Sequence, residues 1–158
     1  MTIVTVTTPE GRLSLEQRQE LAETLTDAVL VPEVGQFAPQ ARIGFQVHFQ
    51  ERPRDQVAIG GKLLSNLPAG AADIATIDIC VMDAAWPKEV RKQVIQNVLA
   101  AMAKACRMDK ASPTWWTTFR TVDEGSWGSR GSVLSILDLL SSGVFTPERI
   151  TEIRKALG

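Results

Sequence analysis

The sequence TIVTVTTPEGRLSLEQ, residues 2–17, contains one strand, one turn and the start of one helix. Residues 3–8 are mostly β-branched, which is typical of a β-strand. A proline and a glycine then break the strand pattern. Ser14 and Gln17 form a capping box, which predicts a helix from Leu15. The stretch therefore predicts a strand that leads through a short turn into a helix.

The residues that follow complete a β-α-β unit. The helix carries an apolar stripe at helical spacing, formed by Leu21, Leu25 and Val29. Pro32 and Gly35 are expected to end the helix. Residues 43–49, IGFQVHF, then alternate between apolar and polar or small side chains. Alternation of this kind predicts a second strand with two distinct faces.

The second half of the chain repeats the first. Residues 75–82, ATIDICVM, alternate like a strand, and Pro87 suits the first position of a helix. That helix has its own apolar stripe, formed by Val90, Val94, Val98 and Met102. Residues 114–122, TWWTTFRTV, predict the closing strand. Because matching elements lie roughly 70 residues apart, we interpret the chain as a tandem duplication.

The duplication predicts an α+β fold in one domain over residues 1–158. Tandem β-α-β units, about 2–66 and 74–140, would form a four-stranded mixed sheet with two helices on one face, and a further helix would cover 146–157. Strands joined by a crossing helix are usually parallel. The other face of the sheet would be uncovered, which predicts an oligomer.

Composition excludes several classes of partner. The net charge is −1 and the basic residues form no stripe, so neither a nucleic acid nor a membrane is an expected partner. The first residues lack the cationic start and apolar core of a signal peptide. Cys80 and Cys106 lack metal-ligand spacing, and a disulfide between them is not expected. We expect a reduced, cytoplasmic protein without a metal or cofactor.

Three stretches together resemble the tautomerase superfamily. TIVTVTTPEGRLSLEQRQELAETLTDAV (2–29) resembles its first strand and helix, and ERPRDQVAIGGK (51–62) resembles the segment after its second strand. VDEGSWGSRGSVLSILDLL (122–140) resembles the carboxy-terminal segment of its malonate semialdehyde decarboxylase branch. The resemblance implies a β-α-β-β-α-β fold and a homotrimer of fused units, each similar to 4-oxalocrotonate tautomerase.

The resemblance also directs attention to the amino terminus. In that superfamily the mature chain begins with proline, whose amine acts as a base at the mouth of a hydrophobic pocket. This chain has Thr2 instead. If Met1 is removed, Thr2 presents a primary amine, whose unperturbed pKa of about 7.7–8.0 allows it to act as a base. That amine can also form a Schiff base with a carbonyl compound. If Met1 stays, the amine is displaced by one residue and the usual chemistry is lost.

Other positions match the superfamily unevenly. Arg12 matches an arginine that binds the substrate carboxylate, and Trp127 approximates a tryptophan of the pocket wall. Gln46 stands where the oxalocrotonate branch has a second carboxylate-binding arginine. Asp83 and Ala85 stand where the decarboxylase branch has paired arginines. The resemblance therefore supports the fold more completely than any one activity.

Four further residues are candidates for substrate binding by their own chemistry. His48 is the only histidine and lies on the polar face of its strand. Its role there is either catalytic or structural. Trp116 and Arg120 share one face of their strand. They either give a binding pocket an aromatic wall and a cation, or they only pack against neighbouring side chains. Arg130 belongs to the glycine-bearing segment SWGSRG, which either cradles an anion or forms a plain turn.

We interpret the chain as a tautomerase-like enzyme that transfers a proton on a small carbonyl carboxylic acid. Thr2 would supply the amine base, Arg12 the carboxylate anchor and Trp127 part of the wall. The alternative is a catalytically inactive binding or assembly protein that keeps the trimeric scaffold. A third hypothesis is an unrelated ferredoxin-like regulatory domain, which would be a monomer.

Overall fold

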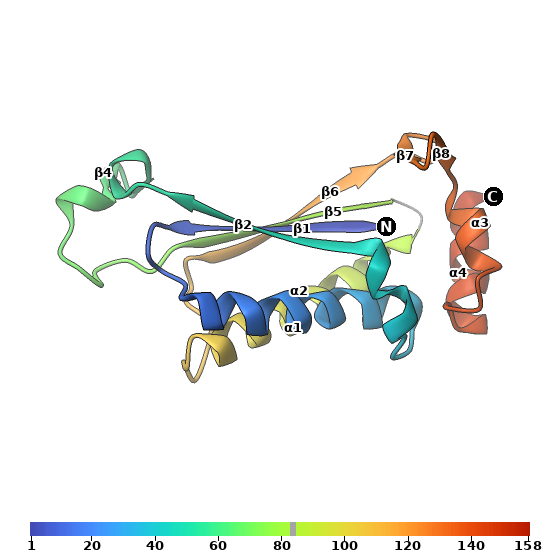
Figure 1. The fold of residues 1–158 in the computed structure, drawn as a ribbon, viewed down its shortest axis with the longest axis horizontal. Coiled ribbons are helices and arrows are strands. Elements are labelled where there is room, and N and C mark those ends of the chain that lie inside the picture. The colour runs from blue at the N-terminus through green and yellow to red at the C-terminus, as the bar shows by residue number, and fades with distance from the viewer. Residues whose placement is uncertain (83–84) are drawn as a thin grey trace.

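The computed structural model describes residues 1–82 and 85–158, so Asp83 lies outside the described residues. One layer is a four-stranded sheet with the order β2-β1-β5-β6, and the other contains two long helices. The strands and helices are β1 (Thr2–Pro9), α1 (Leu15–Val34), β2 (Phe45–Arg52), β5 (Ala75–Met82), α2 (Lys88–Ala105) and β6 (Trp115–Val122). Both helices cover the same face of the sheet (Figure 1). The predicted α+β architecture is therefore confirmed.

The sheet is built from two parallel pairs that meet antiparallel. β1 is parallel to β2 and β5 is parallel to β6, whereas β1 and β5 run in opposite directions with Thr2 opposite Val81. β5 starts 73 residues after β1, at Ala75 against Thr2, and α2 starts 73 residues after α1. The two β-α-β units therefore begin at opposite ends of the sheet.

Local sequence explains most element boundaries. Ser14 and Gln17 form the predicted capping box, and α1 starts at Leu15. The expectation that Pro32 ends this helix was wrong, because Pro32 lies inside it. The helix ends at Gly35, whose φ of 85° is the left-handed conformation that glycine adopts readily.

Two other expected boundaries shift by one or two residues. Pro87 is the residue before α2 rather than its first residue, because its ψ of 164° is extended. β2 begins at Phe45 rather than at residue 43, because Pro39–Gly44 forms a 3-10 helix, η1. The strand pattern of the sequence could not distinguish this turn from the strand that it precedes.

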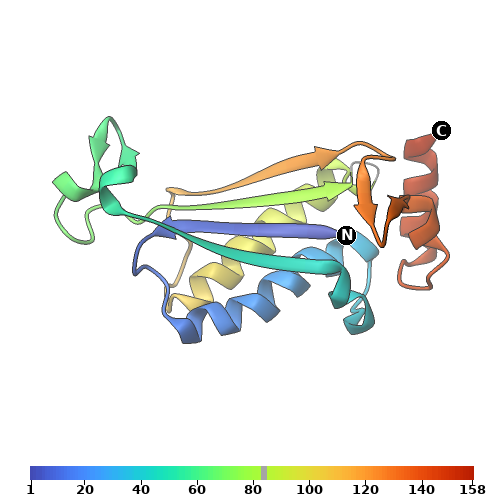
Figure 2. The same ribbon diagram turned by 45° about the horizontal axis from the view of Figure 1, so that its top comes forward.

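The core lies between the sheet and the two helices. Alternate residues of β1 and β5, among them Val4, Val6, Ile77 and Ile79, are buried against the predicted stripes of α1 and α2. Burial of these side chains provides most of the favourable free energy of folding. The opposite face of the sheet carries the alternate side chains that point away from the helices. Among residues 1–82 and 85–158, no helix covers this face (Figure 2).

Two small hairpins extend the sheet at its two ends. One comprises β3 (Ala58–Ile59) and β4 (Lys62–Leu63), flanked by the 3-10 helices η2 (Arg54–Gln56) and η3 (Leu64–Asn66). The other comprises β7 (Trp127–Ser129) and β8 (Ser132–Leu134) and is followed by α3 (Ile136–Leu140) and α4 (Pro147–Leu157). The second hairpin and α4 lie at the end of the sheet where β1 begins (Figure 2).

The carboxy-terminal helix packs against the end of α1. Thr146 caps α4 by accepting a hydrogen bond from the Arg149 backbone N–H, and its own N–H donates to Val34 O at 2.9 Å. Ile153 of α4 is completely buried. The two chain termini therefore lie at the same end of the molecule (Figure 1).

None of the helices within residues 1–82 and 85–158 has the length and apolar character needed to cross a membrane. Cys80 and Cys106 are free thiols.

Candidate functional site

A cavity of about 370 Å³ opens at the amino terminus. This volume lies within the range of small-molecule sites. Four parts of the chain build it: Met1 just before β1, the last turn of α1, the η1–β2 junction, and the segment between β7 and α4. Its lining is Met1, Leu30, Glu33, Val34, Ala41, Ile43, Gly44, Phe45, Ser129, Arg130, Leu134, Leu139, Ser142, Val144 and Phe145. The cavity is therefore largely apolar, with one acidic and one basic side chain.

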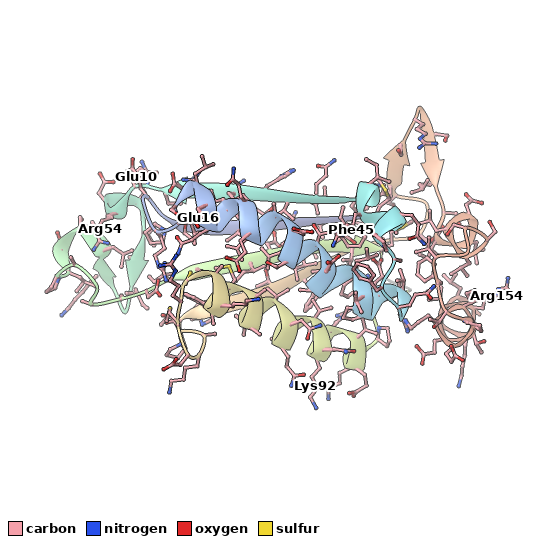
Figure 3. All side chains as sticks on the ribbon, turned by 60° about the horizontal axis from the view of Figure 1, so that its bottom comes forward. Glu10, Glu16, Phe45, Arg54, Lys92 and Arg154 are labelled. Carbon is pink, nitrogen blue, oxygen red and sulfur yellow. The ribbon has the colours of Figure 1, made fainter. Side chains whose placement is uncertain are left out.

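The amino terminus enters this cavity because β1 begins with the second residue of the chain. Thr2 is 1% exposed, and its Oγ1 has no hydrogen-bond partner among the described residues. Met1 continues into the cavity wall, where its sulfur lies beside Gly44. Phe45, labelled in Figure 3, also lines the cavity. It starts β2, where it pairs with Thr2 of β1. The chain's leading nitrogen therefore lies beside a concave, apolar surface.

Glu33 is the acidic side chain of the cavity and is 2% exposed. Its burial raises the pKa of the carboxyl group, because desolvation disfavours the charged form. The Met1 amino group, the Trp86 indole and the Arg149 guanidinium act in the opposite direction. No hydrogen bond of good geometry joins the Trp86 indole N–H to a partner among the described residues. A buried carboxyl group with a raised pKa beside an amine is suited to donating or accepting a proton.

Arg149 of α4 lies directly behind Glu33 and is 6% exposed. Its Nε donates to the backbone oxygen of Glu33 at 3.0 Å, and its Nη2 donates to Ala85 O at 2.5 Å. Its Nη1 pairs with Glu152. The guanidinium is thus satisfied from three directions, as burial of a charge requires.

Arg12 lies at the other end of β1 from Thr2. Its Nε and Nη2 donate to the two carboxylate oxygens of Asp73 at 2.6 and 2.8 Å, and the guanidinium lies over the Trp115 ring. The Arg12 hydrogen bond holds the pKa of Asp73 below its usual value. Within one chain, the structure therefore does not bring Arg12 to the amino-terminal cavity.

The other candidates fall into two groups. Gln46, His48, Trp116 and Arg120 all lie on the uncovered face of the sheet. There His48 Nε2 lies 3.0 Å from Gln46 Oε1, and Arg120 Nε donates to Asp78 at 2.7 Å.

The second group belongs to the β7–β8 hairpin. Trp127 is partly buried against the core, whereas Arg130 occupies the turn with a φ of 53° and lines the amino-terminal cavity. Of the sequence-predicted site residues, Arg130 is the one that shares this cavity with the start of the chain.

Sequence reasoning missed Glu33, although a signal for it exists. Leu21, Leu25 and Val29 repeat every fourth residue, and Glu33 is the next position of the same stripe. All three apolar members are completely buried. A carboxylate at a position that the pattern reserves for an apolar side chain indicates a buried acid, and buried acids concentrate at functional sites.

A second cavity of about 780 Å³ lies between the end of α1, the start of α2 and α4. Arg149, Glu152 and Trp86 line it, and Met1 does not. Within the described parts of the chain, no group of three or more His, Cys, Asp or Glu side chains could hold a metal ion.

No protein-family model matches the sequence, and no curated protein matches it either. Solved structures do match. A native fused 4-OT has a TM-score of 0.67 at 18% identity, covering 83% of this chain and 94% of that chain. A symmetric trimer of a fused 4-OT gives 0.65 at 20% identity, covering 85% and 96%.

A third match extends over almost the whole chain. The protein N1, of the cis-3-chloroacrylic acid dehalogenase family, has a TM-score of 0.68 at 15% identity and covers 97% of this chain and 99% of that chain. These likenesses show that the chain has the fused tautomerase-superfamily fold, as the sequence predicted.

Proposed function

We propose that this chain is a cytoplasmic enzyme that transfers a proton on a small carbonyl carboxylic acid in the amino-terminal cavity. One observation carries the proposal: the start of the chain lines an apolar cavity together with a buried carboxyl group and an arginine. An amine in such surroundings is suited to act as a base next to a carbonyl. A fused 4-OT has the same fold as this chain, and this likeness supports the proposal.

The residues take distinct roles in this proposal. After removal of Met1, the Thr2 amine would take the place at the end of β1 and act as the base. Arg130 would bind the substrate carboxylate, because a guanidinium pairs with a carboxylate through two hydrogen bonds. We assign this role to Arg130 rather than Arg12, since the Arg12 guanidinium already holds Asp73. Trp127 would support the hairpin that carries Arg130.

The cavity is expected to prefer a monocarboxylate with an apolar tail. Phenylenolpyruvate should react with a kcat/KM about 10–100-fold higher than the dicarboxylate 2-hydroxymuconate, because a second buried carboxylate left unpaired costs about 1–3 kcal/mol. Arg130 is the one basic side chain among the described lining residues. Initial rates with both compounds measure this preference.

An Arg130→Gln variant is the matched control for that measurement. It should raise KM for both compounds and leave the preference for the apolar tail in place. Equal kcat/KM values for the two compounds would contradict the preference. Rates no higher than those of buffer with both compounds would contradict the proposed activity itself.

We also propose a homotrimer in which the uncovered sheet face is buried. Trp116 is 66% exposed on this face, and some structures with the same fold are trimers. Light scattering should give three times the chain mass of 17.3 kDa. Trp116→Glu should shift the population towards monomer, because burying an unpaired charge is costly. Leu15→Glu, at an equally exposed position on the helix layer, should leave the mass unchanged.

A non-catalytic binding protein is the second candidate. The observation that favours it is the bidentate Arg12–Asp73 pair, which occupies the expected carboxylate anchor. Intact-mass measurement after incubation with a keto acid and cyanoborohydride distinguishes the two. A retained Met1 and no adduct would favour the binding protein, whereas an adduct at Thr2 would favour the enzyme.

A further inference from the structure

We propose that Glu33 is the acid that exchanges a proton with the substrate carbon in the amino-terminal cavity, and that Arg149 is the positioning residue that holds Glu33 there. This inference rests on the proposed function, but it assigns residues outside the sequence-predicted site. Glu33 ends the buried stripe of α1 and lines the same cavity as Met1. An acid and an amine at one apolar cavity form a pair that can work on opposite sides of a proton transfer.

The charged groups around Glu33 come from every element that packs against it. The Met1 amino group lies at the start of β1, the Arg149 guanidinium belongs to α4, and Arg130 lies in the β7–β8 turn. Glu152 faces Glu33 only through Arg149. Burial keeps the pKa of the Glu33 carboxyl raised against the opposing effects of the Met1 amine and Arg149. Glu33 can therefore hold a proton at a pH where an exposed glutamate has lost it.

Arg149 acts on Glu33 rather than on the substrate. Its hydrogen bonds go to Glu33 O, Ala85 O and Glu152, and it lines the 780 Å³ cavity instead of the one that contains Met1. The bond to Glu33 O fixes the last turn of α1, from which the carboxyl group projects. A buried arginine that clamps a backbone carbonyl in this way sets the position and the electrostatic environment of the side chain in front of it.

The internal duplication gives a second argument. The two turns between strand and helix have equal length, so Ala85 in the second repeat corresponds to Arg12 in the first. Arg12 pairs with Asp73 at the far end of the sheet, whereas alanine supplies no guanidinium at the amino-terminal end. Arg149, from a helix outside both repeats, brings a guanidinium to that position through Ala85 O. At each end of the sheet, an arginine therefore lies beside a residue that bears a carboxylate.

The proposed step balances with the groups present. For an enol substrate, the neutral amine takes the hydroxyl proton, and the electrons of the broken O–H bond form the carbonyl π bond. The π electrons of the C=C bond form a new C–H bond with the proton of the Glu33 carboxyl. The resulting ammonium group then returns a proton to the Glu33 carboxylate. Both groups are restored, and no oxidant, reductant or co-reactant is consumed.

The pH dependence of kcat for phenylenolpyruvate tests this assignment. Glu33 must be protonated to act, so kcat should fall as the pH rises through its pKa. Glu33→Gln should remove this fall, the high-pH limb of the kcat profile, and lower kcat about 10²–10⁴-fold. Arg149→Lys should move the limb, because the position and strength of the cation behind Glu33 change. Glu152→Gln removes the anion that offsets Arg149, so it should move the limb to lower pH.

Arg154→Gln is the matched control on the same helix, because Arg154 is exposed at the outer edge of the molecule (Figure 3) and lines neither cavity. It should leave the limb unchanged. A Glu33→Gln variant with unchanged kcat and an unchanged limb would overturn the assignment while the proposed activity survived. Absence of activity in the unaltered protein would overturn both.

A readout without catalysis separates these cases further. In the unfolded chain Glu33 ionises near its ordinary pKa of 4.5, whereas in the folded chain it keeps its proton to higher pH. Between these two values the folded state binds more protons, so stability falls as the pH rises. Glu33→Gln should therefore gain stability relative to the unaltered protein across this window and gain nothing below it. A difference that does not change with pH would overturn the assignment.

Discussion

The Gly35→Ala variant is expected to lose about 2–5 kcal/mol of unfolding free energy. Gly35 has a φ of 85°, and the left-handed conformation costs a residue with a Cβ about 1–2 kcal/mol. The added Cβ would also lie 2.7 Å from Thr146 Oγ1 and 2.9 Å from Arg149 Cγ. Relieving such overpacking typically costs a further 1–3 kcal/mol. Urea denaturation at constant pH measures the loss.

Gly11→Ala is the matched control for this prediction. Gly11 also has a left-handed φ, of 74°, but its added Cβ would meet nothing within 4 Å. Its loss should be confined to the conformational cost of about 1–2 kcal/mol. Equal losses in the two variants would show that α4 does not pack tightly on the end of α1. Because Arg149 would move with α4, Gly35→Ala should also shift the Glu33-dependent limb of kcat.

Displacing the amino terminus by one residue is expected to reduce kcat about 10²–10⁴-fold. The chain beginning at Thr2 should be active, whereas the same chain carrying an additional alanine in front of Thr2 should not. The extra residue places the amine where the Met1 nitrogen lies, one residue before β1. A base displaced by one residue from its catalytic position loses the contribution of general base catalysis. Intact mass identifies the first residue of each preparation, and phenylenolpyruvate gives the rates.

An additional alanine after Gly158 is the control for chain extension. This terminus lies at the same end of the molecule but outside the cavity lining (Figure 1). The carboxy-terminal extension should leave kcat unchanged. Full activity of the amino-terminally extended chain would exclude the Thr2 amine as the base.

The fold could be predicted from the sequence because local residue patterns mark the strands and helices of each repeat. Alternation in residues 75–82 and the capping box at Ser14 depend on neighbours a few residues apart, and the duplication supplied the same pattern twice. The end of α1 was harder to predict. Pro32 tolerates a place near the end of a helix when the last turn is held by tertiary contacts, which a local pattern does not contain.

The candidate site could be predicted only in part. The start of the chain and Arg130 meet in one cavity, because β7 follows β6 to the end of the sheet where β1 begins. The Arg12–Asp73 pair joins the first repeat to the residue just before the second, and nothing in the local pattern around either residue points to the other. Arg149 reaches Glu33 from a helix outside the duplication, so the repeat comparison could not supply it.

The opposite orientation of β1 and β5 has a mechanical consequence. Because the two strands run antiparallel, Thr2 and Ala75 lie at opposite ends of the sheet. The Arg12–Asp73 ion pair therefore connects the turn after β1 to the segment that leads into β5. It joins the two β-α-β units at the end of the sheet that is far from the amino terminus.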